Sequence, residues 1–476
     1  MEPDNAHTGS AADGGALPRP SRQSPLPRRR YFGLITMAGC LAMVYGTCVA
    51  SPLTVSFFRD LGATDMHFAL LGGLPMVMLV MQFVGAYLAN RVPRRRPWFI
   101  GLGIAARLLY VPLALMPLIP GVCECVGIPF LILLVVASSG IGNLVGPIWL
   151  SWMGDLIPRS VLNRFWGGRQ RYLMAAWTLA YWGVGLFAFR FAHLSPRHAF
   201  PILVVVGCAA GVTDLLLFLR VPEPENLLTS GPSPWKDLSE PLRHRDYRTL
   251  VLFTCLFAAT TNLAAVFMQL FVLKVLNLAV WKTTLAWSMF GVGTALVAPT
   301  WGRIADRYGH RPILRVCTVF KPLICLVYLL VTPPTAFLVL TISFFFDSML
   351  NSGNEIAVTG YMLKMAPREN RAMFIAANSA LSGIAAGLGG ILGGVILRYT
   401  ANFAPDLLGR QWNNYHLLFL ISLVLRLFCI PLAGAVREPT SAPSRVVVGY
   451  LMDLWPGRLL ALPAGLYRRW RSADEA

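Results

Sequence analysis

Charged residues are scarce in this sequence. Of its 476 residues, 13% are charged and 56% are hydrophobic, and the mean hydropathy is +0.59. Soluble globular domains carry about 25% charged residues, so the composition excludes an ordinary water-soluble fold. It predicts instead a protein whose surroundings are largely lipid.

Acidic residues are the scarcer charged type, with 22 Asp and Glu against 41 Lys and Arg, for a formal net charge of +19. A strongly basic protein can bind nucleic acid, but the placement of the charges argues against that here. With both termini cytoplasmic, roughly thirty basic residues fall in the tails and inner loops, and about seven fall in the outer loops. Because short basic loops resist translocation, the distribution of the basic residues indicates how the chain is oriented in the membrane. We therefore predict no nucleic-acid partner.

Clusters of metal-binding or catalytic side chains are also missing. The seven histidines are scattered, and most of the nine cysteines lie in apolar runs, where cysteine behaves as a small hydrophobic residue. Only Cys123 and Cys125 fall in a predicted outer loop, and a C-x-C pair without a nearby histidine is weak evidence for a metal. We therefore predict no catalytic residue, no metal site and no cofactor.

Long apolar runs, in contrast, are abundant. A helix needs about 20 mostly apolar residues to cross a hydrocarbon core of about 30 Å, and we count twelve such runs. They begin near Phe32, His67, Pro97, Ile128, Tyr172, Ala199, Leu250, Lys282, Pro312, Ala336, Ala372 and Tyr415. The predicted fold class is an all-α membrane protein with twelve transmembrane helices.

Polar segments divide the chain into two helical halves and two tails. Residues 1–30 are rich in Pro, Ser, Gly and Arg and are expected to be a disordered cytoplasmic tail. A charged, proline-rich cytoplasmic linker at 221–249 separates a six-helix bundle at 31–220 from a second one at 250–436. In the cytoplasmic tail at 437–476, Asp and Pro interrupt an apolar stretch, which favours an interfacial amphipathic helix over a thirteenth span.

Two loop sequences recur in the two halves. The segment WGRIADRYGHRPIL (301–314) is matched by LANRVPRRRPWFI (88–100), so that Asn90 corresponds to Asp306 at an offset of 216 residues. The segments MGDLIPRSVLNRFWG (153–167) and MLKMAPRENRAMFIA (362–376) both place a Pro before an Arg and then an aromatic residue. Similarity at a nearly fixed offset indicates an internal repeat, which is common in transporters.

At these residues the sequence resembles the major facilitator superfamily of secondary transporters, over essentially all of residues 31–436. The family's loop between the second and third helices of a half reads G-x-L-A-D-R-x-G-R-R, and GRIADRYGHR (302–311) fits it with Ile304 in place of Leu. The first-half copy departs from it, with Ala86 and Pro93 replacing glycines and Asn90 replacing the acid. The resemblance implies two pseudo-symmetric six-helix bundles, acting as a monomer in a plasma or inner membrane with both termini cytoplasmic.

The resemblance also implies that the loop motif latches the two halves together on the cytoplasmic side. Gly302 would let another helix approach closely. Asp306 would accept hydrogen bonds from Arg307 or from free N–H groups at the start of the fifth helix, near Arg164 or Arg169. A simple topology anchor is the alternative, and the uncharged Asn90 predicts a weaker first-half latch. The gate motif predicted is Gly302, Asp306, Arg307, Gly309 and Arg311, with Asn90, Arg91 and Arg95 in the first half.

Ionisable residues inside a membrane are costly and are candidates for function. The tenth helix carries DSMLNSGNE (347–355), which places Asp347, Asn351, Asn354 and Glu355 within an arc of about 100° on one helical face. In the family that the chain resembles, the first and fourth helices of each half line the central cavity, so the tenth is a cavity helix. Glu355 is our candidate for a proton-coupling carboxylate, and Asp347 is the alternative.

Other polar residues are spaced to share a face on neighbouring helices. The cavity candidates are Asn143 with Ser139 on the fourth helix, Asn262 and Gln269 on the seventh, and Asn378 with Ser382 on the eleventh. Each of them could instead bond one helix to another.

Three basic residues also lie inside predicted helices. Arg107 is expected to pair with Asp214 at the periphery of the first half. Lys321 and Arg426 lack a peripheral acid, so they would either reach Glu355 or bind an anionic substrate; the sequence does not separate these two hypotheses.

The function implied by the resemblance is transport of a small organic solute by alternating access, with protons as a candidate second substrate. A polytopic membrane enzyme would need His, Asp or Ser groups at one membrane face, and the outer loops are too short and too poor in them. A non-transporting receptor and an uncoupled facilitator stay open. The run GIAAGLGGILGG (383–394) looks like a phosphate-binding loop, but it lies within the eleventh helix and follows no strand, so we predict tight helix packing.

Overall fold

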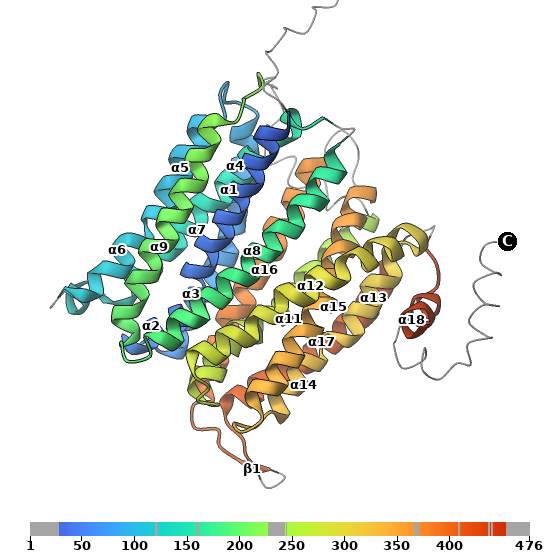
Figure 1. Ribbon diagram of the computed structural model, residues 1–476. Coiled ribbons are helices and arrows are strands. Elements are labelled where there is room, and N and C mark those ends of the chain that lie inside the picture. Colours follow the sequence, from blue (N-terminus) through green and yellow to red (C-terminus); the bar gives the residue numbers. More distant parts are fainter. Residues whose placement is uncertain are drawn as a thin grey trace, which may run out of the picture.

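The computed structural model describes residues 28–119, 122–158, 161–226, 243, 245–365, 371–407, 410–436, 438 and 441–453. These residues are almost entirely helical and form two bundles, the first blue to green and the second yellow to red (Figure 1). Within the described part, the strands are the two-residue pair β1 (Asp406–Leu407) and β2 (Arg410–Gln411). The predicted all-α class is confirmed.

The first bundle holds six spans, three of which are broken by a short bend. They are α1 (Arg28–Val49) with α2 (Pro52–Asp60), α3 (Asp65–Val77) with α4 (Met81–Ala89), α5 (Arg96–Leu108) with α6 (Tyr110–Leu115), α7 (Val122–Leu156), α8 (Leu162–Arg190) and α9 (Pro196–Leu217). Pro52 and Pro97 lie in the first turn of α2 and α5, where a missing N–H leaves no hydrogen bond unmade.

The second bundle repeats this arrangement. It consists of α11 (Arg245–Lys274), α12 (Val280–Tyr308), α13 (Arg311–Phe320) with α14 (Leu323–Leu330), α15 (Ala336–Met365), α16 (Arg371–Tyr399) and α17 (Asn414–Ala435). Eleven segments of the described chain are long and apolar enough to cross a membrane. The helix α12 is not among them, but it packs lengthwise against α15 and α8 and takes the place of the twelfth span.

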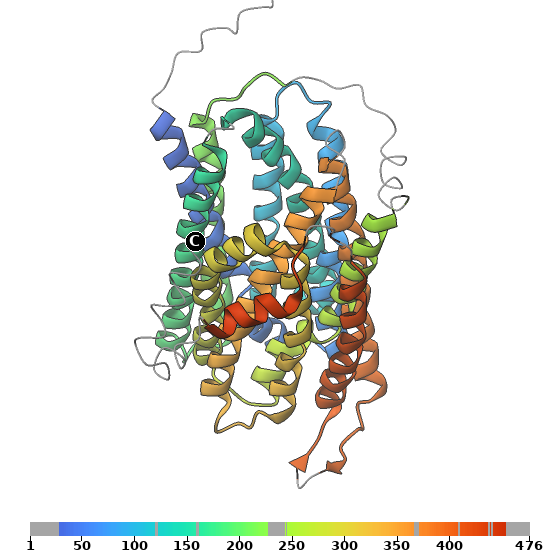
Figure 2. The ribbon, with the colours of Figure 1, turned by 90° about the vertical axis from the view of Figure 1, so that its right-hand side faces the viewer.

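The short helix α18 (Ser444–Asp453) follows the second bundle and lies across it (Figure 2). It packs on α13 and buries Val447 completely. The helix α18 lies in the tail at 437–476, where an amphipathic segment was predicted. Residues 1–27 and 454–476 of the two tails lie outside the described residues.

We call the end of the bundles that carries the turns at 90–95 and 309–310 the motif end, and the opposite end, with β1 and β2, the hairpin end. Contacts between the halves gather at the hairpin end. Arg59 Nη1 donates to the Leu273 carbonyl over 2.8 Å, and Asp65 accepts from the Tyr415 hydroxyl over 2.6 Å and from Lys274 Nζ over 3.2 Å. These bonds hold the halves together there.

Glycines extend this contact toward the middle of the molecule. A Cβ at Gly387 of α16 would lie 2.6 Å from the Gly73 carbonyl of α3 in the other half. Within the second half, one at Gly393 would lie 2.3 Å from the Leu263 carbonyl of α11. Only glycine permits helices to approach so closely. The run at 383–394 therefore serves helix packing, as predicted.

The buried apolar clusters show where the halves separate. One cluster combines residues of both halves, among them Phe57 and Phe271. Two others lie toward the motif end and belong to one half each, one around Trp152 and one around Trp301. The bundles are therefore joined at the hairpin end and diverge toward the motif end (Figure 1).

Candidate substrate cavity and gate

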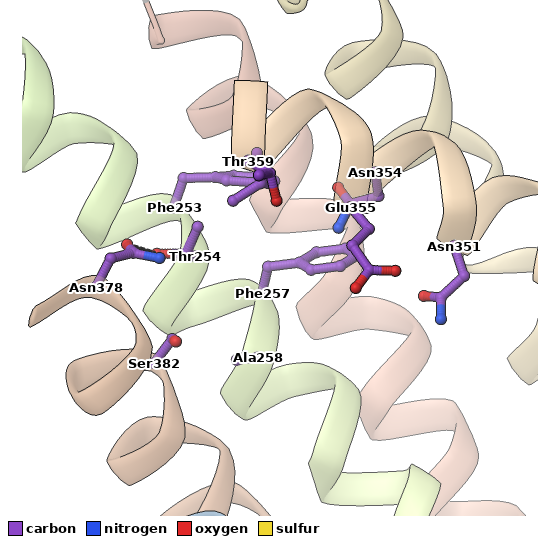
Figure 3. Close-up of a pocket in the computed structure, with 11 residues that line it drawn as sticks. Phe253, Thr254, Phe257, Ala258, Asn351, Asn354, Glu355, Thr359, Asn378 and Ser382 are labelled. Atoms are coloured by element: carbon purple, nitrogen blue, oxygen red, sulfur yellow. Dashed lines mark hydrogen bonds between the residues drawn. The ribbon is translucent and has the colours of Figure 1, made fainter. Parts of the chain in front are cut away.

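A cavity of about 320 Å³ opens in the second half among α11, α15 and α16. Three of the four residues predicted on the polar stripe of α15 reach it: Asn351, Asn354 and Glu355 (Figure 3). The described residues that line it are Phe253, Thr254, Phe257, Ala258, Asn351, Asn354, Glu355, Val358, Thr359, Asn378 and Ser382.

Glu355 is the one charged residue among the described residues of this lining. Its side chain is exposed, and within the described part of the chain it forms no hydrogen bond or ion pair. Figure 3 shows the carboxylate between the ring of Phe257 and the amide of Asn351. The cavity therefore offers one negative charge without a protein counter-ion.

Neutral polar groups form the opposite wall. The Thr254 hydroxyl donates to Asn378 Oδ1 over 2.7 Å and joins α11 to α16, and Ser382 lies one turn farther along α16 (Figure 3). Phe253 and Phe257 stack with their ring centroids 5.5 Å apart. The predicted candidates Asn378 and Ser382 thus share one site with Glu355, although they come from another helix.

Asp347, the outer member of the stripe, is used differently. Its Oδ1 lies 2.8 Å from Lys321 Nζ, and the same Nζ donates to Asn351 Oδ1 over 3.0 Å. Lys321 is 5% exposed, so it needs an anion close by, and Asp347 supplies it. As expected, no acid of a peripheral helix pairs with Lys321 in the described chain; its acid, Asp347, comes from α15, a partner that neither hypothesis included. Asn351 contacts both this ion pair and the cavity.

The other two cations inside the helices also lie away from Glu355. Arg107 binds Asp214 through two hydrogen bonds of 2.9 and 2.7 Å, which confirms the predicted pair. Arg426 is 1% exposed and donates from Nη2 to the Thr261 carbonyl over 3.1 Å. Among the described residues, neither Lys321 nor Arg426 pairs with Glu355, so the first of the two hypotheses is not met in this structure.

The remaining cavity candidates are not brought to the Glu355 site. Asn143 accepts from Gln82 Nε2 over 3.3 Å and lines a separate cavity of about 480 Å³ in the first half, next to Arg107. Asn262 donates to the Ala258 carbonyl of its own helix. Neither Asn262 nor Gln269 lines either cavity. Spacing along one helix predicts a shared face, but it does not say which neighbour that face meets.

In the gate motif, the backbone of one residue, Gly309, is strongly constrained, whereas several other residues do not make the predicted contacts. Gly309 ends α12 with φ of +86°, and a Cβ there would lie 3.0 Å from Glu438 Oε2. At Gly302, nothing lies within 4 Å of an added Cβ. The close helix approach predicted for Gly302 is therefore not made in this conformation, because the halves diverge at the motif end.

Asp306 is exposed and forms no hydrogen bond or ion pair within the described chain. The predicted contact with Arg169 at the start of the fifth helix, α8, is not made: the Arg169 guanidinium instead lies 5.1 Å from the Trp149 ring and 5.3 Å from that of Trp166. The side chain of Arg164, the other predicted partner, lies outside the described residues. In the first half, Asn90 and Arg91 are likewise exposed, and Arg91 covers the ring of Tyr87. These residues are exposed because the two halves are separated at the motif end.

An acid that sequence analysis missed binds the motif end of the second half. Glu438 Oε2 accepts from the backbone N–H groups of His310 and Arg311, over 2.8 and 2.9 Å, at the start of α13. Its Oε1 lies 2.8 Å from Lys364 Nζ. The carboxylate thus occupies the helix N-terminus, where free N–H groups and the helix dipole favour an anion.

The first half contains the same device. Glu223 accepts from the N–H groups of Arg95 and Arg96 at the start of α5. The signal was present in the sequence, as VPEP at 221–224 and VREP at 436–439, directly after the sixth helix of each half. The predicted gate residue Arg95 is completely buried and binds Asp155 over 2.6 Å within its own half, and Arg311 Nη2 binds the Gly434 carbonyl.

Comparison with known families assigns the chain. The Major Facilitator Superfamily profile matches residues 34–339 and 250–466. The chain belongs to this superfamily. None of the curated proteins compared matches the sequence. Membership makes the chain a multi-pass membrane transporter of a solute and not an enzyme.

Solved structures agree with the superfamily fold. A mutant of the nucleoside transporter NupG gives a TM-score of 0.65 at 13% identity, over 86% of this chain and 100% of its own. A bacterial homologue of the human lysosomal transporter Spinster, inward-facing and occupied, gives 0.63 at 14%, over 88% and 100%. A D-xylose–proton symporter gives 0.63 at 14%, over 86% and 98%. At these identities the likeness establishes the fold alone.

Glu438 makes the stability of this superfamily member depend on pH. Burial raises the pKa of the Glu438 carboxyl, but hydrogen bonds from Lys364 and from the N–H groups of Arg311 and His310 outweigh burial and hold the pKa below its ordinary value of 4.5. A carboxyl with a lowered pKa stabilises the fold above that ordinary value and loses the effect as the pH falls through the folded value.

Glu438→Gln is therefore expected to lower the melting temperature at pH 7.5, with a loss of about 1–3 kcal/mol in the free energy of unfolding. The difference from wild type should shrink progressively as the pH falls below 4.5 and through the lower pKa of the folded carboxyl. Thermal melts of the purified protein from pH 7.5 to pH 3 measure this. Glu225→Gln, the same change at an exposed position after the sixth helix of the first half, is the control. A difference that stays constant over this range would contradict the assigned role.

Proposed function

We propose that this transporter moves a small polar organic solute by alternating access and that Glu355 couples the movement to protons. The observation that carries the proposal is the exposed Glu355 carboxylate, which has no counter-ion among the described residues and whose other described neighbours in the cavity are neutral. A carboxylate free of a permanent partner can gain and lose a proton during a transport cycle. The D-xylose–proton symporter among the similar structures supports coupling of this kind.

In this proposal, the structure represents the state that opens toward the motif end. The two halves would rock about their contacts, so that Glu355 faces each side of the membrane in turn. Asn351 would hold the substrate beside Glu355 while Lys321 and Asp347 fix the orientation of its amide. The transport reaction then requires movement of the halves and no chemical change in the solute.

The solute is found first by binding and then by transport. A thermal-shift screen of the purified protein against sugars, nucleosides, amino acids, amines and carboxylates selects the compound that raises the melting temperature most. Proteoliposomes then test whether a proton gradient drives its accumulation. Uptake that only equalises the two concentrations, with or without the gradient, would leave transport intact and refute proton coupling.

We place the motif end in the cytoplasm of a plasma or inner membrane, because the basic loops lie at that end. In a background with Cys123 and Cys125 changed to Ser, Arg94→Cys and Glu225→Cys should react with an impermeant thiol reagent only after the membrane is opened. Ala401→Cys and Ala404→Cys, at the hairpin end, should react in intact cells. Labelling of both motif-end variants from outside would refute this topology.

We also propose that Asp306 latches the halves when the motif end closes. Asp306→Asn is expected to slow transport several-fold without changing substrate affinity, because the residue is exposed here and lies outside the cavity. Equilibrium binding and transport rates in proteoliposomes measure the two effects, and Arg303→Gln on the same turn serves as a control for the loss of a surface charge. Unchanged rates would make Asp306 a topology anchor only.

A further inference from the structure

We infer that the substrate of the Glu355 cavity is an organic cation and that substrate and proton compete for this one carboxylate. The inference rests on the proposed function and adds to it the class of substrate and the kind of coupling.

The charge of the cavity favours a cation over an anion. Within the part of the chain that the structure describes, Glu355 is the one charged group in the lining, so the ionised cavity carries a single negative charge there. Lys321 is bound by Asp347 and Asn351, and Arg426 donates to the Thr261 carbonyl and does not line the cavity. An anionic solute would meet an uncompensated carboxylate, whereas a cation would form a charge-assisted contact with it.

The wall beside the carboxylate suits an organic cation in particular. Phe257 lies next to Glu355, and its ring stacks with that of Phe253 (Figure 3). An aromatic face attracts an ammonium group through its quadrupole and also packs against the apolar part of an amine. Asn354, Thr254 and Ser382 offer neutral hydrogen-bonding groups across the cavity. A protonated or quaternary amine that carries an aromatic or hydroxyl-bearing group fits this set.

The number of acids decides the coupling. Because the lining provides one carboxylate, Glu355 holds either a proton or the cation at a given time. Asp347 cannot act as the second site while it pairs with Lys321. Binding of a cation therefore releases the proton, and binding of a proton releases the cation. This mutual exclusion produces exchange of the two across the membrane rather than joint transport.

Other titratable groups near α15 must be separated from Glu355 in a test that varies pH. The Lys321–Asp347 pair stands behind Asn351, and the His310 ring lies against Gly360, farther along the helix, with Lys364 beyond it. None of these groups lines the cavity. A Glu355 variant keeps all of them, so it shows which part of a pH dependence belongs to Glu355.

The test measures binding to the purified full-length protein with three probes of one shape. Benzyltrimethylammonium is a permanent cation, neopentylbenzene is its neutral counterpart, and phenylmethanesulfonate is an anion of similar size. Calorimetric titration between pH 4 and pH 8 should show that the cation binds at least about tenfold more tightly at pH 8 than either the neutral or the anionic probe. Its Kd should rise toward the acid end of this range, because protons compete with the cation for the Glu355 carboxylate.

Glu355→Gln should weaken cation binding about tenfold or more and remove its pH dependence. Glu355→Asp keeps the charge and should retain both, and Glu225→Gln controls for loss of an acid elsewhere. Melting temperatures verify that each variant is folded. Equal binding of the three probes, or cation binding unchanged in Glu355→Gln, would overturn the inference. A pH dependence that persists in Glu355→Gln would assign it to another group, such as His310, and would overturn the competition.

Failure of this inference is distinguishable from failure of the proposed function. If Glu355→Gln abolishes gradient-driven accumulation but binds the cation like wild type, the coupling role stands and the substrate class is wrong. If cation binding depends on Glu355 while accumulation of substrate does not, the substrate class stands and the coupling role is wrong.

Discussion

Replacement of Glu355 by glutamine is expected to abolish accumulation driven by a proton gradient while exchange of substrate for substrate continues. Glutamine keeps the shape and hydrogen bonding of the side chain, but it cannot release or take up a proton. The halves can still rock with substrate bound, so exchange persists at saturating substrate, with a raised KM where Glu355 also binds the solute. Proteoliposome uptake with an imposed gradient, and counterflow without one, measure the two processes.

Glu225→Gln is the matched control, because it makes the same change at an exposed position outside the cavity. The melting temperature of Glu355→Gln should stay near that of wild type, because the Glu355 carboxylate forms no ion pair within the described chain. Accumulation by Glu355→Gln at the wild-type level would rule out Glu355 as the coupling residue. Loss of both accumulation and exchange would point to a failure of substrate binding or of movement instead.

The Lys321–Asp347 pair should give the largest change in stability. Lys321→Met leaves Asp347 without its cation in the interior of the second half, and a buried charge without a partner costs about 3–5 kcal/mol. Asp347→Leu leaves Lys321 in the same position and should cost a similar amount. Thermal melts of each single variant should show a fall of many degrees.

The double variant Lys321→Met with Asp347→Leu separates structure from function. Replacing both charges with apolar groups of similar size is often neutral for stability, so its melting temperature should return close to the wild-type value. Asn351 would still lose the hydrogen bond from Lys321, so substrate affinity should remain weaker than in wild type. A double variant as unstable as the single ones would show that the charges act independently rather than as a pair.

The end of the fourth helix forms an ion pair in both halves, but the helix residue is an acid in the first half and a base in the second. At the end of the fourth helix of each half, Asp155 and Lys364 occupy corresponding places in the two repeats of the second loop sequence. Asp155 binds the Arg95 side chain, whereas Lys364 binds Glu438. The partners are not equivalent, because Arg95 precedes α5 whereas Glu438 follows α17. Both contacts nevertheless tie the end of the fourth helix to the start of the third, where Glu438 binds the N–H groups of His310 and Arg311.

Sequence by itself determined the class of this protein, its division into two repeated halves, and the polar face on the tenth helix. These properties are local: the length of an apolar run decides whether it crosses a bilayer, and helical spacing places Asn351, Asn354 and Glu355 on one face. The Arg107–Asp214 pair was also predictable, because two opposite charges in neighbouring peripheral helices have few other partners.

Only the tertiary structure decided which partner each residue of that face contacts. Asp347 and Glu355 lie on the same stripe of one helix, yet Asp347 meets Lys321 and Glu355 meets an open cavity. The helices packed around α15 differ along its length, and no feature of its own sequence encodes which neighbour each turn meets. The same holds for Asp306, whose partner depends on whether the halves are together or apart at the motif end. Contacts between distant segments follow from the packing of whole helices, because each partner is selected by geometry that all of the helices set together.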